Sequence, residues 1–182
     1  MTLLQNYCLK RKINSILNNA TIRKSRSYSL NDARSFFISY NENDAEEAIQ
    51  CVMSLTSLGK KVHICTFIPR TPSRAKYESN VSPLVIKESE LSMTGMPASQ
   101  LREAFNNTQA DILIDLTREE DMVMHYLQLR HPAPFKVGNK SSIRDMFDLT
   151  VTKKTEDDLP TSFGHMLGFL QTIRTNERPL KD

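Results

Sequence analysis

The chain has 182 residues, 39% of them hydrophobic and 25% charged, which is typical of a globular protein with a buried core. Its five glycines leave little scope for a glycine-rich nucleotide loop. The chain has no apolar run of the roughly 18 residues that a membrane helix needs, and its net charge of +3 is unevenly distributed.

The first predicted element is a cationic helix over about residues 2–20. Leu9, Ile13, Ile16 and Leu17 recur at helical spacing, and most of the basic side chains lie off this stripe. Residues 1–31 contain six basic residues and no acid, which leaves −3 for the rest of the chain. The six are Lys10, Arg11, Lys12, Arg23, Lys24 and Arg26. We expect a helix that docks on the sheet with a solvated basic face, although organellar transit peptides share this composition.

A polar linker over residues 21–34 separates this helix from a β-α-β unit. Strands are expected at 35–40 and 61–67. The helix between them has acids in its first turn and ends before Gly59, as the helix dipole and a C-terminal glycine favour. A helical crossover of this length requires the two strands to be parallel.

Strands and helices continue to alternate in the second half of the chain. The expected elements are a short edge strand at 83–86, a helix at 98–107, a strand at 111–116, a helix at 118–129 capped by Thr117, a strand at 134–138, a strand at 147–151, and a helix at 160–174 starting from Thr161 or Ser162. This order predicts a three-layer, doubly wound α/β fold with a mainly parallel sheet of about five strands, Rossmann-like or flavodoxin-like. Residues 1–31 then form the basic helix and linker, residues 32–175 a single α/β domain, and residues 176–182 a tail.

In such a sheet, ligands bind beyond the carboxyl ends of the strands. Asp115 ends an apolar strand, where burial would raise the pKa of its carboxyl group. After the next strand, Gly138 permits a tight turn, while Lys140, Ser141 and the amides of a following short helix could hold an anion. We therefore predict a site for a phosphate-bearing small molecule at Asp115, Gly138, Asn139, Lys140 and Ser141. The spacing is not that of a P-loop, and an ordinary polar turn is the alternative.

Two other pairs of residues share a helix face. Asp121 and His125 have a spacing that suits a metal or a proton relay, but no third ligand is recognisable, so we predict no metal and no cofactor. Gly164 and Gly168 are expected to permit close contact between the last helix and the sheet. No residue is assigned a catalytic role, and the sequence leaves open whether the protein is an enzyme.

Several short motifs together resemble an uncharacterised family of small cytoplasmic proteins from Bacteroidota. They are Asp115-Leu116-Thr117, His125-Tyr126, Phe135-Lys136-Val137-Gly138 and Phe147-Asp148-Leu149. The resemblance covers most of residues 5–175 and implies a bacterial cytoplasmic protein, which argues against a transit peptide. The three cysteines, Cys8, Cys51 and Cys65, form no CxxC motif and agree with a reducing compartment. The resemblance implies no activity.

Two functional hypotheses follow. The first is a non-catalytic binding or adaptor protein whose basic N-terminal helix contacts an acidic partner, namely RNA, a ribosome or an anionic surface. The second is a small-molecule or nucleotide-binding domain, with or without catalytic activity, whose site lies at the carboxyl edge of the sheet.

Overall fold

A computed structural model describes residues 1–19, 26–69, 83–118, 121–139, 143, 146–151 and 158–175. The tail at 176–182 lies outside these ranges. So do Arg23, Lys24, Lys140 and Ser141, for which binding roles are predicted.

The described part of the chain alternates strands and helices, as the sequence predicts. The helices are α1 (Leu3–Asn19), α2 (Ala45–Ser57), α3 (Ser99–Asn107), α4 (Met122–Arg130) and α5 (Leu159–Thr172), with the 3-10 helices η1 (Glu42–Asp44) and η2 (Glu88–Glu90). The strands are β1 (Ser35–Asn41), β2 (Lys61–Ile68), β3 (Leu84–Lys87), β4 (Ile112–Asp115), β5 (Phe135–Asn139) and β6 (Leu149–Val151).

The strands form one sheet in the order β3-β2-β1-β4-β5-β6. Every neighbouring pair is parallel, and Ser39 of β1 lies between Cys65 of β2 and Asp115 of β4. This is the strand order of doubly wound dinucleotide-binding folds. The predicted three-layer α/β architecture is therefore confirmed. The short strand expected at an edge is β3, the outermost strand, and it brings the sheet to six strands.

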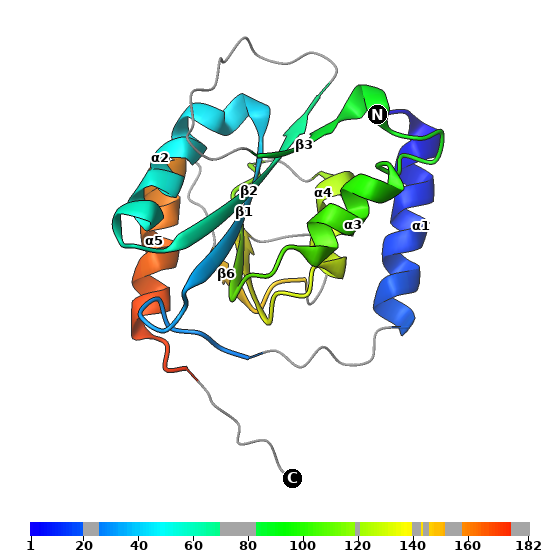
Figure 1. Ribbon diagram of the computed structural model, residues 1–182. Coiled ribbons are helices and arrows are strands. Elements are labelled where there is room, and N and C mark those ends of the chain that lie inside the picture. The colour runs from blue at the N-terminus through cyan, green and yellow to red at the C-terminus, as the bar shows by residue number, and fades with distance from the viewer. Residues whose placement is uncertain are drawn as a thin grey trace.

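Helices cover both faces of the sheet (Figure 1). Helices α2 and α5 pack on one face, and α3 and α4 pack on the other. Because successive side chains of a strand point to opposite faces, Phe36 and Ile38 of β1 join the core beneath α2 and α5. Phe37 joins the second core, beneath α3 and α4. Both faces of the central strands are therefore buried.

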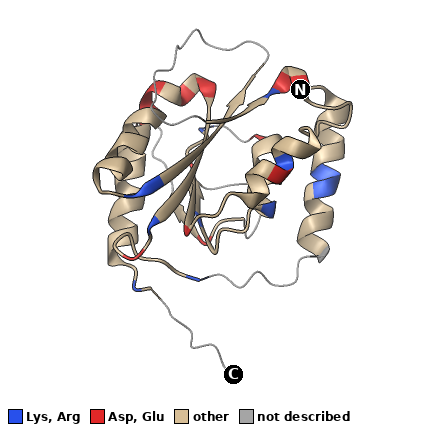
Figure 2. Ribbon diagram, in the orientation of Figure 1, with Lys and Arg blue, Asp and Glu red and all other residues tan. Residues whose placement is uncertain are grey.

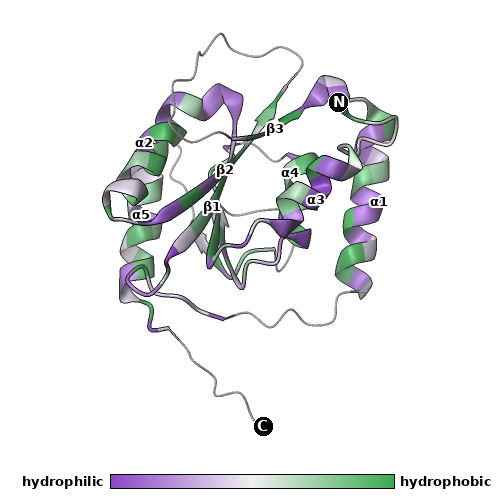
Figure 3. Ribbon diagram, viewed as in Figure 1, coloured by the Kyte–Doolittle hydropathy of each residue, from purple (hydrophilic) through white to green (hydrophobic). Residues whose placement is uncertain are grey.

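Helix α1 lies where the sequence predicts a helix, but it docks on α4 rather than on the sheet. Its apolar side chains Leu9 and Ile13 are fully buried in the same cluster as Met124 and Leu127 of α4. Apolar and polar segments alternate along α1, as an amphipathic helix requires (Figure 3). Every residue from Val123 to Gln128 in α4 is buried. A helix buried on all sides needs cover opposite the sheet, and α1 provides that cover.

Two helices begin at different residues from those predicted, because an aspartate caps each of them. Helix α4 begins at Met122 with Asp121 as its N-cap, while Thr117 instead hydrogen-bonds to Asp115. Helix α5 begins at Leu159, and its N-cap Asp158 accepts a hydrogen bond from Thr161 N at 2.8 Å. A carboxylate satisfies the free amides of a first turn and complements the positive end of the helix dipole.

The expected role of Gly164 and Gly168 is wrong. Both glycines are exposed, and a Cβ added at either position would meet no atom within 4 Å. The inward-facing residues of α5 are instead Phe163, Met166 and Leu170. The two glycines line an open groove beside β6, so they do not allow closer contact with the sheet.

Candidate functional site

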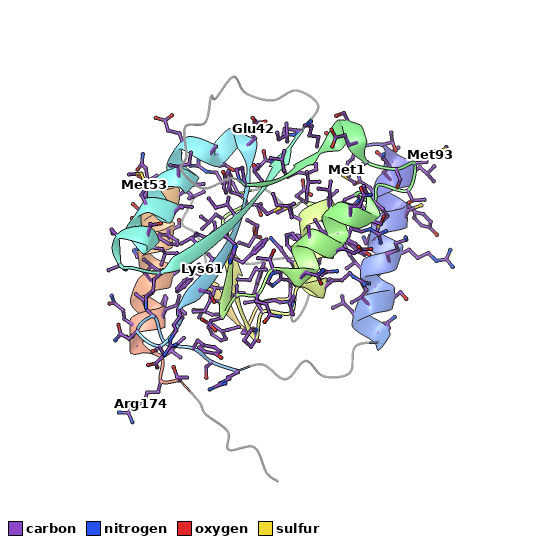
Figure 4. All side chains as sticks on the ribbon, viewed as in Figure 1. Met1, Glu42, Met53, Lys61, Met93 and Arg174 are labelled. Atoms are coloured by element: carbon purple, nitrogen blue, oxygen red, sulfur yellow. The ribbon has the colours of Figure 1, made fainter. Side chains whose placement is uncertain are left out.

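The strand order points to the crevice between β1 and β4 as the place for a ligand. Chain connections leave in opposite directions from these two neighbouring strands, and in open parallel sheets ligands bind beyond the carboxyl ends at such a point. The residues that follow the two strands are Glu42–Asp44 and Leu116–Arg118. Glu42 lies at this edge of the sheet, at the top in Figure 4.

Side chains from three elements close this crevice. Nε of Arg118 lies 3.0 Å from Oδ1 of Asp44, and the same guanidinium group pairs with Glu47 of α2. The backbone N–H of Leu159, at the start of α5, also donates to Glu47, at 2.8 Å. A cavity beside Arg118 and Asn139 has a volume of about 10 Å³, no more than one water molecule occupies. The described side chains that follow β1 and β4 therefore pair with one another across the switch point.

The charge at this edge is also unfavourable for a phosphate. In dinucleotide-binding folds, the pyrophosphate sits at the N-terminus of the helix that follows the first strand. Here Glu42, Asp44, Glu46 and Glu47 occupy that position, and the start of α2 is red in Figure 2. Arg118 pairs with two of these four carboxylates, so the helix terminus keeps a net negative charge, which would repel the phosphates of a nucleotide.

Asp115 ends β4 inside a polar network and is only 3% exposed. Its Oδ1 accepts hydrogen bonds from Thr117 N at 3.2 Å, Thr117 Oγ1 at 3.0 Å and Ser39 Oγ at 3.2 Å. Gln128 Nε2 of α4 in turn donates to Ser39 Oγ at 2.7 Å. Burial raises the pKa of the Asp115 carboxyl group to about 6, although the hydrogen bonds from Thr117 oppose the shift. Protein donors therefore already occupy Oδ1 of this predicted ligand-binding residue.

The structure brings the ends of β4 and β5 together, as the prediction requires, since Asn139 Nδ2 donates to Thr117 O at 3.3 Å. Gly138, however, lies within β5 and not in a turn. A Cβ at this position would lie 2.6 Å from Cζ of Phe147. The glycine therefore makes room for an aromatic ring.

The pair Asp121 and His125 is divided between two structural roles. Oδ1 of Asp121 accepts the N–H groups of Val123 at 2.8 Å and Met124 at 3.0 Å, so it caps α4. His125 is buried within α4, with 2% exposure. In the described ranges there is no cluster of three or more His, Cys, Asp or Glu side chains that could hold a metal ion.

The sequence did not predict that two side chains near the C-terminal end of α4, those of Lys136 and His131, are buried. Lys136 of β5 is 1% exposed, and its Nζ donates to Gln128 O at 2.5 Å, at the C-terminal end of α4. His131 follows α4, and its ring lies against those of Phe37 and Phe105 at centroid distances of 4.6 and 5.3 Å. Burial, reinforced by the charge of Lys136, lowers the pKa of His131 to about 3. The only signal in the sequence was that Lys136 interrupts an apolar run.

The basic residues near the N-terminus divide into two groups. Lys10, Arg11 and Lys12 lie next to one another on α1, and all three are exposed. Arg26 lies elsewhere, with its guanidinium group 5.0 Å from the ring centroid of Tyr28 and its backbone N–H bonded to Pro134 O. In the described residues, the predicted partner-binding cations therefore lie in two places, one turn of α1 and Arg26.

Fold and site together define a three-layer α/β protein that has the Rossmann strand order and an ion-paired arginine, Arg118, at its switch point. The chain belongs to a family of unknown function, DUF6913, whose profile matches residues 5–173 and so includes most of α1. Comparison with curated proteins and with solved structures gave no match. No helix within the described ranges is long and apolar enough to cross a membrane.

Proposed function

We propose that the protein is a non-catalytic binding protein that contacts RNA, free or within a ribosome, through the exposed basic residues of α1. The observation that carries this proposal is the cationic turn Lys10-Arg11-Lys12 on a helix that contains no acidic residue. Phosphate contacts by lysine and arginine provide most of the affinity of such surfaces.

The cationic turn is fixed in place and unneutralised. Leu9 and Ile13 anchor α1 in the core on either side of it. None of its three side chains forms an ion pair with a described residue, and α1 shows blue but no red in Figure 2. Tyr7, one turn earlier, is 66% exposed, so its ring is available for a base to stack on.

RNA suits this surface better than a membrane does. A helix that lies in a membrane interface buries its apolar face in lipid. The apolar face of α1, with Leu9 and Ile13, is buried in protein instead. The large apolar side chains of α1 that are exposed are Leu3 and Leu4 at the start of the helix and Tyr7, while Ile16 and Leu17 are partly buried against the core.

The test is fluorescence anisotropy of the full chain with a single-stranded RNA oligonucleotide between 50 and 200 mM salt. Three phosphate contacts predict a slope of log K against log salt near −2, so that binding weakens about 20-fold over this range. Replacing Lys10 and Arg11 by Gln removes two contacts and should reduce the slope to about −0.7.

The matched control replaces two exposed cations far from α1, Lys61 and Arg174, by Gln (Figure 4). It should leave the RNA affinity and its salt slope unchanged. Affinity that is independent of salt, equal losses in both double variants, or binding to anionic vesicles but not to RNA would each refute the proposal. Point variants are preferable to deletion of residues 1–26, because deletion would uncover α4.

We also infer that the protein works in the cytoplasm of a bacterium of the Bacteroidota, as the family resemblance implies. The three cysteines are free thiols, which agrees with a reducing compartment. Fractionation of such a cell should recover the protein with the cytoplasm. Recovery in the periplasm would contradict this inference.

A second candidate function, a nucleotide or sugar-phosphate site at Asp115, Gly138, Asn139, Lys140 and Ser141, is favoured by the Rossmann strand order. It predicts that a panel of nucleotides and sugar phosphates includes one that raises the melting temperature, and that Lys140→Ala abolishes the shift. The absence of any shift across the panel would reject this candidate.

A further inference from the structure

A cavity with a volume of about 420 Å³ lies between α1, α3 and the segment that joins η2 to α3. None of its lining residues belongs to the segments that follow β1, β4 or β5, and its volume is within the range of about 300–1,000 Å³ typical of small-molecule sites. Lys12 of α1 and Arg102 of α3 both line it. The two helices that carry these cations run along the right-hand side of Figure 1.

The charge of this cavity is positive and uncompensated. Nε of Arg102 is shielded from solvent and has no hydrogen-bond partner among the described residues. Lys12 likewise forms no ion pair within the described part of the chain. Glu90 also lines the cavity, but it already pairs with Lys87, whose Nζ lies 2.9 Å from its Oε1. Shielded guanidinium donors normally have acceptors, so Nε of Arg102 is a donor that an anion in the cavity would satisfy.

The N-terminus of α3 adds further donors to the same cavity. Its N-cap position is held by Ala98, which has no side chain to cap the helix, and its first turn contains no acid. Ala98 and Ser99 line the cavity. The first free amides of the helix, the positive end of its dipole and the Ser99 hydroxyl group therefore border the space beside Arg102.

The opposite wall of the cavity is preorganised. Ser92 and Met96 close a tight turn, with Ser92 N donating to Met96 O at 2.9 Å and Met96 N donating to Ser92 Oγ at 3.1 Å. Within it, Gly95 adopts a positive φ of 78° and lies against Gln5 and Leu9 of α1, where a Cβ would come within 3.1 Å of both. Because α1 already holds this wall in place, ligand binding loses no free energy in ordering it.

We propose that this cavity binds a phosphate group, with the Arg102 guanidinium and the Lys12 ammonium as its cationic partners and the start of α3 as a source of neutral donors. A guanidinium group, an ammonium group and the amides at the start of α3 together offer more donors than the two oxygens of a carboxylate can accept, and they match the several oxygens of a phosphate better. The cavity is much larger than a phosphate ion, so the group is carried by a larger molecule, either a small phosphomonoester such as a nucleoside monophosphate or the 5′ end of an RNA. The proposal rests on the cavity itself, and only Lys12 is shared with the RNA-binding surface of α1.

The experiment is calorimetric titration of the full chain at low salt with inorganic phosphate, AMP, and one RNA oligonucleotide with and without a 5′ phosphate. We expect phosphate and AMP to bind, and Arg102→Gln to weaken both at least tenfold. Lys12→Gln should weaken the binding of phosphate and AMP less, because a lysine ammonium lacks the planar, paired donors of a guanidinium group. Arg130→Gln, an exposed arginine outside the cavity, is the matched control and should change nothing. Weaker RNA binding without the 5′ phosphate identifies an RNA end as the source, whereas equal binding of both oligonucleotides identifies the small ester.

The proposal is overturned if neither phosphate nor AMP binds, or if Arg102→Gln binds them as tightly as the native chain does. Binding that is abolished by Lys140→Ala and unaffected by Arg102→Gln would also overturn it, in favour of the carboxyl edge. The double variant of Lys10 and Arg11 separates this site from the RNA surface, because it should spare AMP binding. If Arg102→Gln fails to fold, the exposed Lys12 still provides the comparison.

Discussion

The buried carboxyl group of Asp115 gives the sharpest prediction on stability. Its pKa is raised to about 6 in the folded state by burial, against about 3.9 in an unfolded chain. Below pH 4 both states hold the proton, and between pH 4 and pH 6 the folded state holds it more. The extra protonation of folded Asp115 therefore stabilises the folded state at low pH. This contribution to the free energy of unfolding is lost as the pH rises through 6, because the carboxyl group is then both ionised and buried.

Asp115→Asn tests this directly, because an amide can accept the hydrogen bonds of Thr117 and Ser39 without becoming charged. Linkage predicts that the native chain loses about 1 kcal/mol of unfolding free energy between pH 5 and pH 8 that the variant keeps. Other titrating groups are common to both chains and cancel in the difference.

The assay is urea denaturation of both chains at pH 5 and pH 8. The slope of the unfolding free energy against urea concentration is compared between the chains, because equal slopes allow their free energies to be compared directly. The control, Glu46→Gln, removes a carboxylate from an exposed position and so measures the effect of losing an acid that is not buried. If the difference between Asp115→Asn and the native chain were the same at both pH values, the reasoning about the buried carboxylate would be refuted.

Two further predictions concern the packing around α4 and β5. His131 stays neutral when folded, since burial lowers its pKa to about 3, so stability should fall as the pH drops below about 6.5. Urea denaturation should therefore show that His131→Phe gains about 2 kcal/mol relative to the native chain between pH 7 and pH 5, and a constant difference would contradict this. Gly138→Ala should destabilise the fold by about 1–3 kcal/mol, because the new Cβ meets the ring of Phe147. Thermal denaturation should show that Phe147→Leu relieves part of this loss, whereas full additivity of the two changes would exclude the clash.

Most of the fold could be predicted because its signals are local. Apolar runs such as Ile112–Ile114 have the length and composition of buried strands, and the spacing of Leu9 and Ile13 is helical. The strand order could not be predicted in this way, since it depends on which strands pair across more than 40 residues of chain, as β1 and β4 do. The docking of α1 on α4 was hidden for the same reason.

The candidate site was less predictable, because it depends on contacts between distant residues. The requirement for Gly138 comes from the ring of Phe147, and no turn is involved. The burial of Lys136 depends on the carbonyl groups at the end of α4. The cavity at Arg102 exists only because α1 folds back beside α3, and a lone arginine on a short helix gives no sign of this.

The contact between α1 and α4 has a consequence for biosynthesis. About a hundred residues separate Leu9 and Ile13 from their neighbours Met124 and Leu127. On a translating ribosome, the first helix emerges long before the surface that will shelter its apolar stripe exists. During that interval its leucine and isoleucine side chains face water beside three positive charges, and a nascent-chain chaperone or the ribosome surface can hold them. We expect arrested chains that end before residue 118 to be cleaved by protease within α1, and the completed chain to be resistant there.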